Sequence, residues 1–252
     1  MPARSVSSAR SVSTGMLCAA VLLGAVAGNA ARADPVPAAA QPARTLRWLD
    51  PQAFAPDRIL PEPPAIGSVE ERAEMAEIQA FAKLTPADRK AQALADGEDE
   101  TPHAFNGATG RDLAALPATA HLLAEINEDI EAIADVAKRH FHRARPYAID
   151  AALVHCGNGK VGGKGADRSY PSGHSTFGWS TAWVLGNLMP ARRVAIFARA
   201  EDFGYSRQIC AVHFTSDIEA GHVLGVLAAQ ALLADPRLAA DIAAARAELA
   251  NP

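Results

Sequence analysis

The sequence predicts an all-α fold built as a single-domain helical bundle. Several stretches place apolar residues three or four positions apart, the spacing that builds one face of an α-helix. No stretch alternates apolar and polar residues as a β-strand does, and the sequence shows no internal repeat. These observations favour helices packed on one another over a sheet or a solenoid.

Residues 1–33 have the anatomy of a secretory signal peptide. Arg4 and Arg10 give a basic start without acids, residues 16–27 form a short apolar core, and Ala31-Arg32-Ala33 fits an A-x-A cleavage site. Because the core is too short for a stable bilayer span, cleavage and export are favoured over an uncleaved anchor.

Cleavage would leave 252 − 33 = 219 residues, enough for one domain with a sizeable core. The leader holds three of the 24 basic residues and none of the 28 acids, so the mature charge is (24 − 3) − 28 = −7. A net acidic chain is a poor candidate for nonspecific nucleic-acid binding. No membrane span is expected after cleavage, because no apolar run there approaches ~20 residues.

Two cysteines, Cys156 and Cys210, remain once the leader has removed Cys18. An even pair in an oxidising compartment favours a disulfide. A Cys/His zinc site is the competing interpretation, since His155 precedes Cys156 and His213 lies three residues after Cys210. The closely paired ligands typical of zinc sites are absent, so neither a metal nor another cofactor is expected.

The N-terminal half begins with residues 34–64, whose eight prolines predict an extended surface segment. A helical domain is expected over residues 65–252. Its first helices are predicted between Glu70 and Leu94, with a new helix capped at Thr85-Pro86, and residues 95–110 are predicted to be a loop. The extended segment is expected to be anchored by its large apolar side chains, Trp48, Leu49, Phe54, Ile59 and Leu60.

The clearest helix begins at Pro117 and should end by Arg145, because the residue before Pro146 is disfavoured in the α region. Its apolar face is formed by residues at spacings of four, four, three and four: Leu122, Ile126, Ile130, Ile133 and Ala137. Further helices are predicted over residues 176–188, 191–205, 218–233 and 239–250.

Residues 156–168 form a glycine-rich loop carrying Lys160, Lys164 and Arg168. The pattern of a nucleotide-binding P-loop fails, because Asn158 and Gly165 occupy positions that need Gly and Ser or Thr. We expect a basic loop at the mouth of a site. Two interpretations stay open: preference for multiply charged substrates, or charges that are simply solvated.

Three segments carry the chemistry: Lys138-x6-Arg145-Pro146, Pro171-Ser172-Gly173-His174 and Ser206-Arg207-x5-His213-x3-Asp217. Cations also favour helix C-termini in general, which explains some of the charge around residue 140. The clamp predicted for a tetrahedral oxyanion combines the three cations with the amides at a helix N-terminus: Lys138, Arg145, Arg207, Ser172, Gly173 and His174.

Asp217 lies four residues after His213, so on a helix the two share one face. The carboxylate can fix the tautomer of His213 and leave the other ring nitrogen as a nucleophile. His174 can then protonate the leaving oxygen. The pattern predicts phosphoryl transfer by positioning and charge neutralisation, without a metal.

Together these segments resemble the three-part signature of the type 2 phosphatidic acid phosphatase superfamily, which also includes vanadium haloperoxidases. Within it the chain is similar to class A bacterial nonspecific acid phosphatases, from about Ile59-Leu-Pro-Glu-Pro-Pro-Ala-Ile-Gly-Ser68 through Ala104-Phe-Asn-Gly107 to the C-terminal helix. Two positions depart from the class A pattern, Arg168 in place of Gly and Ser175 in place of Thr. They flank the site and bear on substrate preference.

The resemblance implies an all-α phosphomonoesterase with a phosphohistidine at His213, His174 as general acid and then base, and Asp217 as orienter. It implies that the phosphate is held by Lys138, Arg145, Ser172, Gly173 and Arg207. It further implies a periplasmic enzyme, a dimer in many members, and a disulfide between Cys156 and Cys210. The expected substrate is a small phosphomonoester and the product inorganic phosphate. The balance between hydrolysis and transfer to other hydroxyls stays open.

Two other functions fit parts of the pattern. A vanadium haloperoxidase would use the same anion site to hold vanadate. A phosphate-binding protein without turnover would need the cations but neither histidine. A membrane-embedded lipid phosphatase is disfavoured by the lack of long apolar runs.

Overall fold

The computed structural model describes residues 45–250, which fall within one compact unit of the chain. The predicted signal peptide and residues 34–44 lie outside the described residues. Over residues 45–250 the chain forms α-helices and short 3-10 helices and no strand, which confirms the predicted all-α class. The elements are α1 Pro56–Ile59, α2 Val69–Leu84, α3 Ala87–Glu98, η1 Pro102–Phe105, α4 Asn106–Thr109, η2 Leu113–Ala115, α5 Pro117–Phe141, α6 Pro146–Ile149, α7 Gly173–Leu188, η3 Pro190–Arg192, α8 Arg193–Ile209, α9 Thr215–Leu233, η4 Pro236–Leu238 and α10 Ala239–Ala250.

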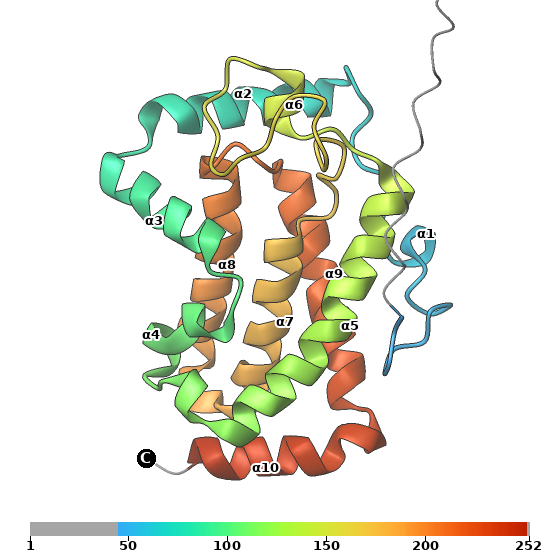
Figure 1. The fold of residues 1–252 in the computed structure, drawn as a ribbon, viewed down its shortest axis with the longest axis vertical. Helices are drawn as coiled ribbons and strands as arrows, with labels where there is room; N and C mark the ends of the chain where they lie inside the picture. The colour runs from blue at the N-terminus through green and yellow to red at the C-terminus, as the bar shows by residue number, and fades with distance from the viewer. Residues whose placement is uncertain (1–44, 251–252) are drawn as a thin grey trace, which may run out of the picture. The chain divides into compact units, whose positions relative to one another are not determined.

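Helix α7 is the centre of the bundle. It packs against α8 and α9, while α5 crosses it and α10 packs against α5 (Figure 1). Most of its residues are buried, so it has no polar face of the kind a surface helix shows. Its N-terminal end is therefore fixed from several sides, and it is at this end that the predicted motifs gather.

Glycines in α9 allow α7 and α9 to approach closely. A Cβ atom added at Gly225 would lie 2.4 Å from the carbonyl oxygen of Thr176, and one at Gly221 would lie 2.6 Å from that of Ser172. Real Cβ atoms do not come so close to a backbone oxygen. These two positions therefore hold the start of α7 directly against α9.

Helix α5 has the predicted apolar face, and all five residues of that face are buried. Pro117 occupies its first turn, where a proline costs no hydrogen bond. The helix ends at Phe141, because His142 adopts a left-handed conformation with φ of 49°. Arg143 and Arg145 consequently follow the helix instead of forming its last turn.

The N-terminal segment is held by one buried carboxylate. Asp129 of α5 accepts hydrogen bonds from the backbone amides of Arg47, Trp48 and Leu49, at 2.7, 2.9 and 2.7 Å. The predicted apolar anchors all lie in or against the main core, with Leu49 and Leu60 fully buried. The segment is not extended throughout, because α1 forms a helical turn that begins with Pro56 at its first position.

Several boundaries differ from the prediction. The break at Thr85-Pro86 between α2 and α3 is confirmed. The loop predicted over 95–110 is wrong, because it contains the end of α3, η1 and α4. The helices expected from residues 176, 191 and 218 begin at Gly173, Arg193 and Thr215, and α8 continues to Ile209. The earlier starts of α7 and α9 and the later end of α8 place the three site motifs on or beside helix ends.

Candidate active site

A cavity of about 370 Å³ lies at the N-terminal end of α7. The end of α5, the end of α8 and the segment before α9 meet the start of α7 here, so residues as far apart in sequence as Lys138 and His213 line one space. Its lining includes six of the predicted site residues: Lys138, Arg145, Gly173, His174, Arg207 and His213. The structure thus brings the three motifs together.

Lys138 and Arg145 approach the cavity from the end of α5 and the loop after it. The Nζ of Lys138 donates to the carbonyls of Arg168 and Pro171, at 3.1 and 2.5 Å. The guanidinium of Arg145 donates to the carbonyls of Gly165 and Val212, at 3.0 and 3.1 Å. Backbone carbonyls hold both cations in place without neutralising their charge.

The start of α7 supplies the amides of the site. Ser172 is the buried N-cap, and its Oγ accepts from the amide of Ser175 at 3.3 Å. The amide of Ser172 itself donates to the carbonyl of Asp217 at 2.9 Å. The amides of Gly173 and His174 belong to the first turn, where an α-helix offers no internal acceptor and carries a partial positive charge.

Arg207 lies near the end of α8 and is only 7% exposed. Its Nε and Nη1 atoms are buried and have no hydrogen-bond partner among residues 45–250. A buried guanidinium left with unpaired N–H groups is costly, and an anion in the adjoining cavity would satisfy it. This is the clearest sign that the cavity is built for a negatively charged ligand.

His213 and Asp217 meet, but not as the sequence predicted. His213 precedes α9, which begins at Thr215, so the two are not on one face of a helix. Instead, Asp217 turns back across the N-terminus of α9, where its Oδ2 accepts from the amide of Phe214 at 2.8 Å. In this position Oδ2 lies 3.5 Å from Nδ1 of His213.

The surroundings of His213 fix its tautomer. Its Nε2 lies 3.2 Å from Nη1 of Arg145. Arginine only donates hydrogen bonds, so Nε2 must accept and Nδ1 carries the hydrogen that faces Asp217. The 3.5 Å separation is long for a hydrogen bond, as catalytic contacts often are before substrate binds.

Two functional residues were missed by the sequence interpretation. The guanidinium of Arg143 donates to Asp217 and to Glu74, each at 2.7 Å, and Ser169 donates to Asp217 at 2.5 Å. Both are buried. The sequence pattern attributed the charge around residue 140 in general to the end of a helix. The left-handed conformation of His142 ends α5 before Arg143, whose side chain then reaches Asp217.

The charges in the cavity shift the titration of its groups. Burial, reinforced by Arg145, lowers the pKa of Lys138 to about 7. Burial and the neighbouring Arg207 lower the pKa of His174 to about 3, and burial also holds the pKa of His213 well below its usual value. For Arg207, burial and Arg145 lower the pKa to about 10. Each of these four pKa shifts disfavours the positively charged form of its group, and a bound anion would oppose the shift.

The basic loop contributes one side chain to the cavity lining. Arg168 lines the cavity and forms an ion pair with Asp135 of α5. Lys160 and Lys164 are exposed and are not among the lining residues. The wall beyond Lys138 also carries Glu131 and Glu100, so the mouth of the site combines charges of both signs.

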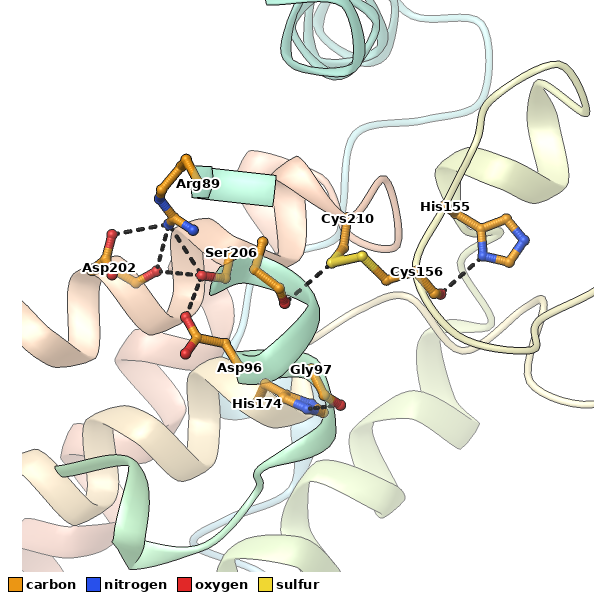
Figure 2. The surroundings of a disulfide bond; sticks show 10 residues. Arg89, Asp96, Gly97, His155, Cys156, His174, Asp202, Ser206 and Cys210 are labelled. Atoms are coloured by element: carbon orange, nitrogen blue, oxygen red, sulfur yellow. Dashed lines mark hydrogen bonds and ion pairs between the residues drawn. A yellow bond between two sulfur atoms is a disulfide. The ribbon is translucent and has the colours of Figure 1, made fainter. Parts of the chain in front are cut away.

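The predicted disulfide joins Cys156 to Cys210, whose Cα atoms are 4.9 Å apart (Figure 2). Cys210 lies between Arg207 and His213, so the bond ties the loop after α6 to the turn that carries two site residues. His155 lies beside this disulfide. Its ring stacks on Tyr147, with centroids 4.2 Å apart, and its Nδ1 donates to the carbonyl of Cys156.

The histidines outside the motifs have structural contacts. His222, which lies on a different part of α9 from Asp217, stacks on Trp179 with ring centroids 3.5 Å apart. Trp179 and Trp183 both pack against the main core. His103 pairs with Asp99 on the surface.

Within residues 45–250, no single helix has the length and apolar composition needed to cross a membrane. Only the bent pair Thr215–Leu233 and Pro236–Ala250, with a 69° angle between its members, meets that standard by length and composition.

Comparison with known proteins agrees with this site. Residues 119–239, which contain all eight residues of the predicted anion site and catalytic group, match the family described as the PAP2 superfamily. An acid phosphatase of Zymomonas mobilis is 36% identical over 139 residues, covering 55% of this chain and 52% of that protein. A non-specific acid phosphatase of Providencia stuartii is 29% identical over 199 residues, covering 77% and 80%. One from Salmonella typhimurium is 33% identical over 113 residues, 45% of each chain.

Residues 119–239 of the chain carry a PAP2 superfamily domain. Within that superfamily its similarity is to bacterial non-specific acid phosphatases, the group that the sequence motifs indicated. The alignment spans about half the length of the Zymomonas relative.

Proposed function

We propose that this protein is a metal-independent acid phosphatase that hydrolyses small phosphate monoesters through a phosphohistidine at His213. The observation that carries the proposal is the cavity itself. Three cations and the N-terminus of α7 surround one space. Arg207 has buried N–H groups there without a hydrogen-bond partner among residues 45–250, and the Nε2 atom of His213 is the ring nitrogen with a free lone pair to accept or attack. The curated relatives named as acid phosphatases support the same activity.

In the proposed first step, the phosphate dianion binds Lys138, Arg145 and Arg207, with the amides of Gly173 and His174 completing its coordination. Arg145 exchanges its contact with Nε2 of His213 for a phosphate oxygen. The freed lone pair of Nε2 attacks phosphorus, the N–P bond forms, and the P–O bond to the alcohol breaks. His174 gives its proton to the departing oxygen.

In the second step, His174 removes a proton from water, and the water oxygen attacks phosphorus on the opposite side from Nε2. The N–P bond breaks, inorganic phosphate leaves, and both histidines return to their starting states. Asp217 stabilises the positive charge that develops on His213 in both steps. An alcohol in place of water would give phosphoryl transfer by the same path.

His174 must carry a proton to act as an acid, although burial and the charge of Arg207 lower its pKa to about 3. The second-largest cause of that low pKa is the charge of Arg207, which a bound phosphate neutralises. We therefore propose that the substrate itself raises the pKa of His174 and that an acidic medium supplies the proton. The leader segment supports export to the periplasm as part of the same proposal.

The test is hydrolysis of p-nitrophenyl phosphate from pH 4 to 8 by the wild type, by His213→Ala and by His103→Ala. His103 is an exposed histidine outside the cavity, and its variant should retain wild-type activity. We expect His213→Ala to fold normally and lose turnover, and we expect wild-type activity to resist EDTA and yield to vanadate. Wild-type activity in His213→Ala would overturn the mechanism, and loss of activity in EDTA would reveal a required metal.

A further inference from the structure

The C-terminal end of α3 lies directly over the two polar groups that flank the anion site. The carbonyl oxygen of Gly97 accepts a hydrogen bond from Nε2 of His174 at 3.2 Å (Figure 2). A Cβ atom at residue 97 would lie 2.3 Å from Nη1 of Arg207. Glycine at this position therefore lets the backbone of α3 reach both residues.

The residue before Gly97 fastens this backbone to α8. Asp96 is 5% exposed and receives a hydrogen bond from Ser206 at 2.5 Å. Arg199 adds two more, at 2.7 and 3.2 Å, so the carboxylate is held by two residues of α8 that lie about two turns apart. Two consecutive residues of α3, 96 and 97, thus lie against two consecutive residues of α8, 206 and 207.

We propose that Asp96 is a positioning residue for His174, acting through the carbonyl of Gly97. The role of His174 as general acid rests on the function proposed above. The position of the Gly97 carbonyl, and hence the orientation of the imidazole, depends on how Asp96 docks α3 on α8.

The contact also selects the tautomer of His174. A carbonyl oxygen only accepts, so Nε2 of His174 carries a hydrogen and Nδ1 is the nitrogen that faces the cavity. Nδ1 lies 3.5 Å from a carboxylate oxygen of Glu100 at the cavity wall. The ring stacks on Phe203, with centroids 5.7 Å apart, but a half-turn about the Cβ–Cγ bond would keep the same ring plane and exchange Nδ1 with Cδ2. The Gly97 contact selects between these two orientations. Loss of that contact would allow the ring to flip and would misdirect Nδ1.

The α3–α8 interface offers a matched control in Asp202. This carboxylate accepts from Arg89 at 2.9 Å (Figure 2) and from Gln92 at 2.7 Å, both on α3. Its Oδ2 also lies 3.5 Å from Nη1 of Arg199, a longer contact than the 2.7 Å bond from Arg199 to Asp96. Asp96→Asn and Asp202→Asn each remove one negative charge from the same interface. Only the first change alters the residue directly before Gly97, whose carbonyl oxygen holds His174.

The experiment compares two substrates that need the general acid to different degrees. The nitrophenolate of p-nitrophenyl phosphate leaves without a proton, whereas the alkoxide of glycerol phosphate does not. We expect Asp96→Asn to lower kcat for glycerol phosphate at least about tenfold more than kcat for p-nitrophenyl phosphate, with KM little changed. Asp202→Asn should change kcat for the two substrates by the same factor. Equal losses on both substrates in Asp96→Asn would overturn the proposal.

Two further measurements keep the test decisive if Asp96→Asn folds poorly or the wild type proves inactive. Ser206→Ala keeps the Asp96–Arg199 pair but removes one donor, and it should show the same selective loss to a smaller degree. Nitrogen-15 NMR of the His174 ring should show hydrogen on Nε2 in the wild type and a mixture of tautomers in either variant. An unchanged tautomer in the variants would overturn the positioning role. Absence of wild-type turnover would instead refute the proposed function.

Discussion

Gly225→Ala should both destabilise the protein and slow it. The added Cβ would lie 2.4 Å from the carbonyl oxygen of Thr176, about 1 Å inside an ordinary contact. It would also lie 3.1 Å from the amide nitrogen of Ser180. Because both neighbours are backbone atoms of α7, no side chain can move aside, and the two helices must separate.

The magnitude follows from two opposing terms. Overpacking of this kind costs ~1–3 kcal/mol, and the absence of a flexible neighbour places Gly225 at the upper end. Replacing glycine with alanine inside a helix contributes about 1 kcal/mol of stabilisation. The net loss in the free energy of unfolding is about 2 kcal/mol, or a melting temperature lower by roughly 4–8 °C.

The effect on turnover follows from the site's position. Thr176 lies one turn after Ser172, so a shift of the helix displaces the α7 amides relative to Asp217 on α9. A displacement of about 1 Å can slow a reaction by as much as ~100-fold. Urea unfolding and initial rates would measure both effects, with Gly107→Ala as the control, since a Cβ atom there meets nothing within 4 Å. Wild-type stability and rate in Gly225→Ala would refute this account of the interface.

Two further predictions concern buried charge. Arg143→Gln should lower the free energy of unfolding by about 3–5 kcal/mol, because it leaves Asp217 buried without its ionic partner. Arg139→Gln, which removes a surface pair with Asp135, should lower it by less than ~1 kcal/mol. Equal losses for the two variants in chemical denaturation would contradict the stabilising role of the Arg143–Asp217 pair. The pKa of His174 is about 3 in the folded protein against 6.5 in the unfolded chain, so the unfolded chain binds the extra proton and stability falls as pH falls through this range. His174→Asn should therefore lose less stability than the wild type between pH 7 and pH 4, by a difference on the order of 1–3 kcal/mol, and an identical loss would show that His174 is not held neutral.

Local sequence patterns were sufficient to predict the helices of the bundle. The apolar spacing on α5 and the small apolar residues after His174 report directly on burial, so these helices and the all-α class followed from the chain alone. Residues 95–110 were harder, because glycine and proline there mark the ends of η1 and α4 and not a continuous loop. Short helices depend on the surfaces that surround them, which a local pattern does not encode.

The predicted site residues gather at one cavity, but the contacts that hold them could not be read from the sequence. The pairing of His213 with Asp217 was expected from helical spacing, yet it arises from a carboxylate that turns back over a helix start. The contact of Arg143 with Asp217 depends on the left-handed conformation of His142. Glycine is the residue that usually marks such a conformation in a sequence, and this position has a histidine instead. Contacts of this kind are set by tertiary geometry.

The carboxylate of Asp129 has a consequence for how the chain tolerates mutation. Its two oxygens accept hydrogen bonds from the three consecutive amides of residues 47–49. In a β-sheet a neighbouring strand would supply such acceptors, and over the described residues this single carboxylate on α5 supplies them instead. A substitution there would release a segment some 80 positions away and leave α5 itself intact. If the stability of every single substitution were measured, changes at Asp129 should therefore have effects like those of changes in residues 47–49. They should differ from the effects of changes at the residues next to Asp129 on α5.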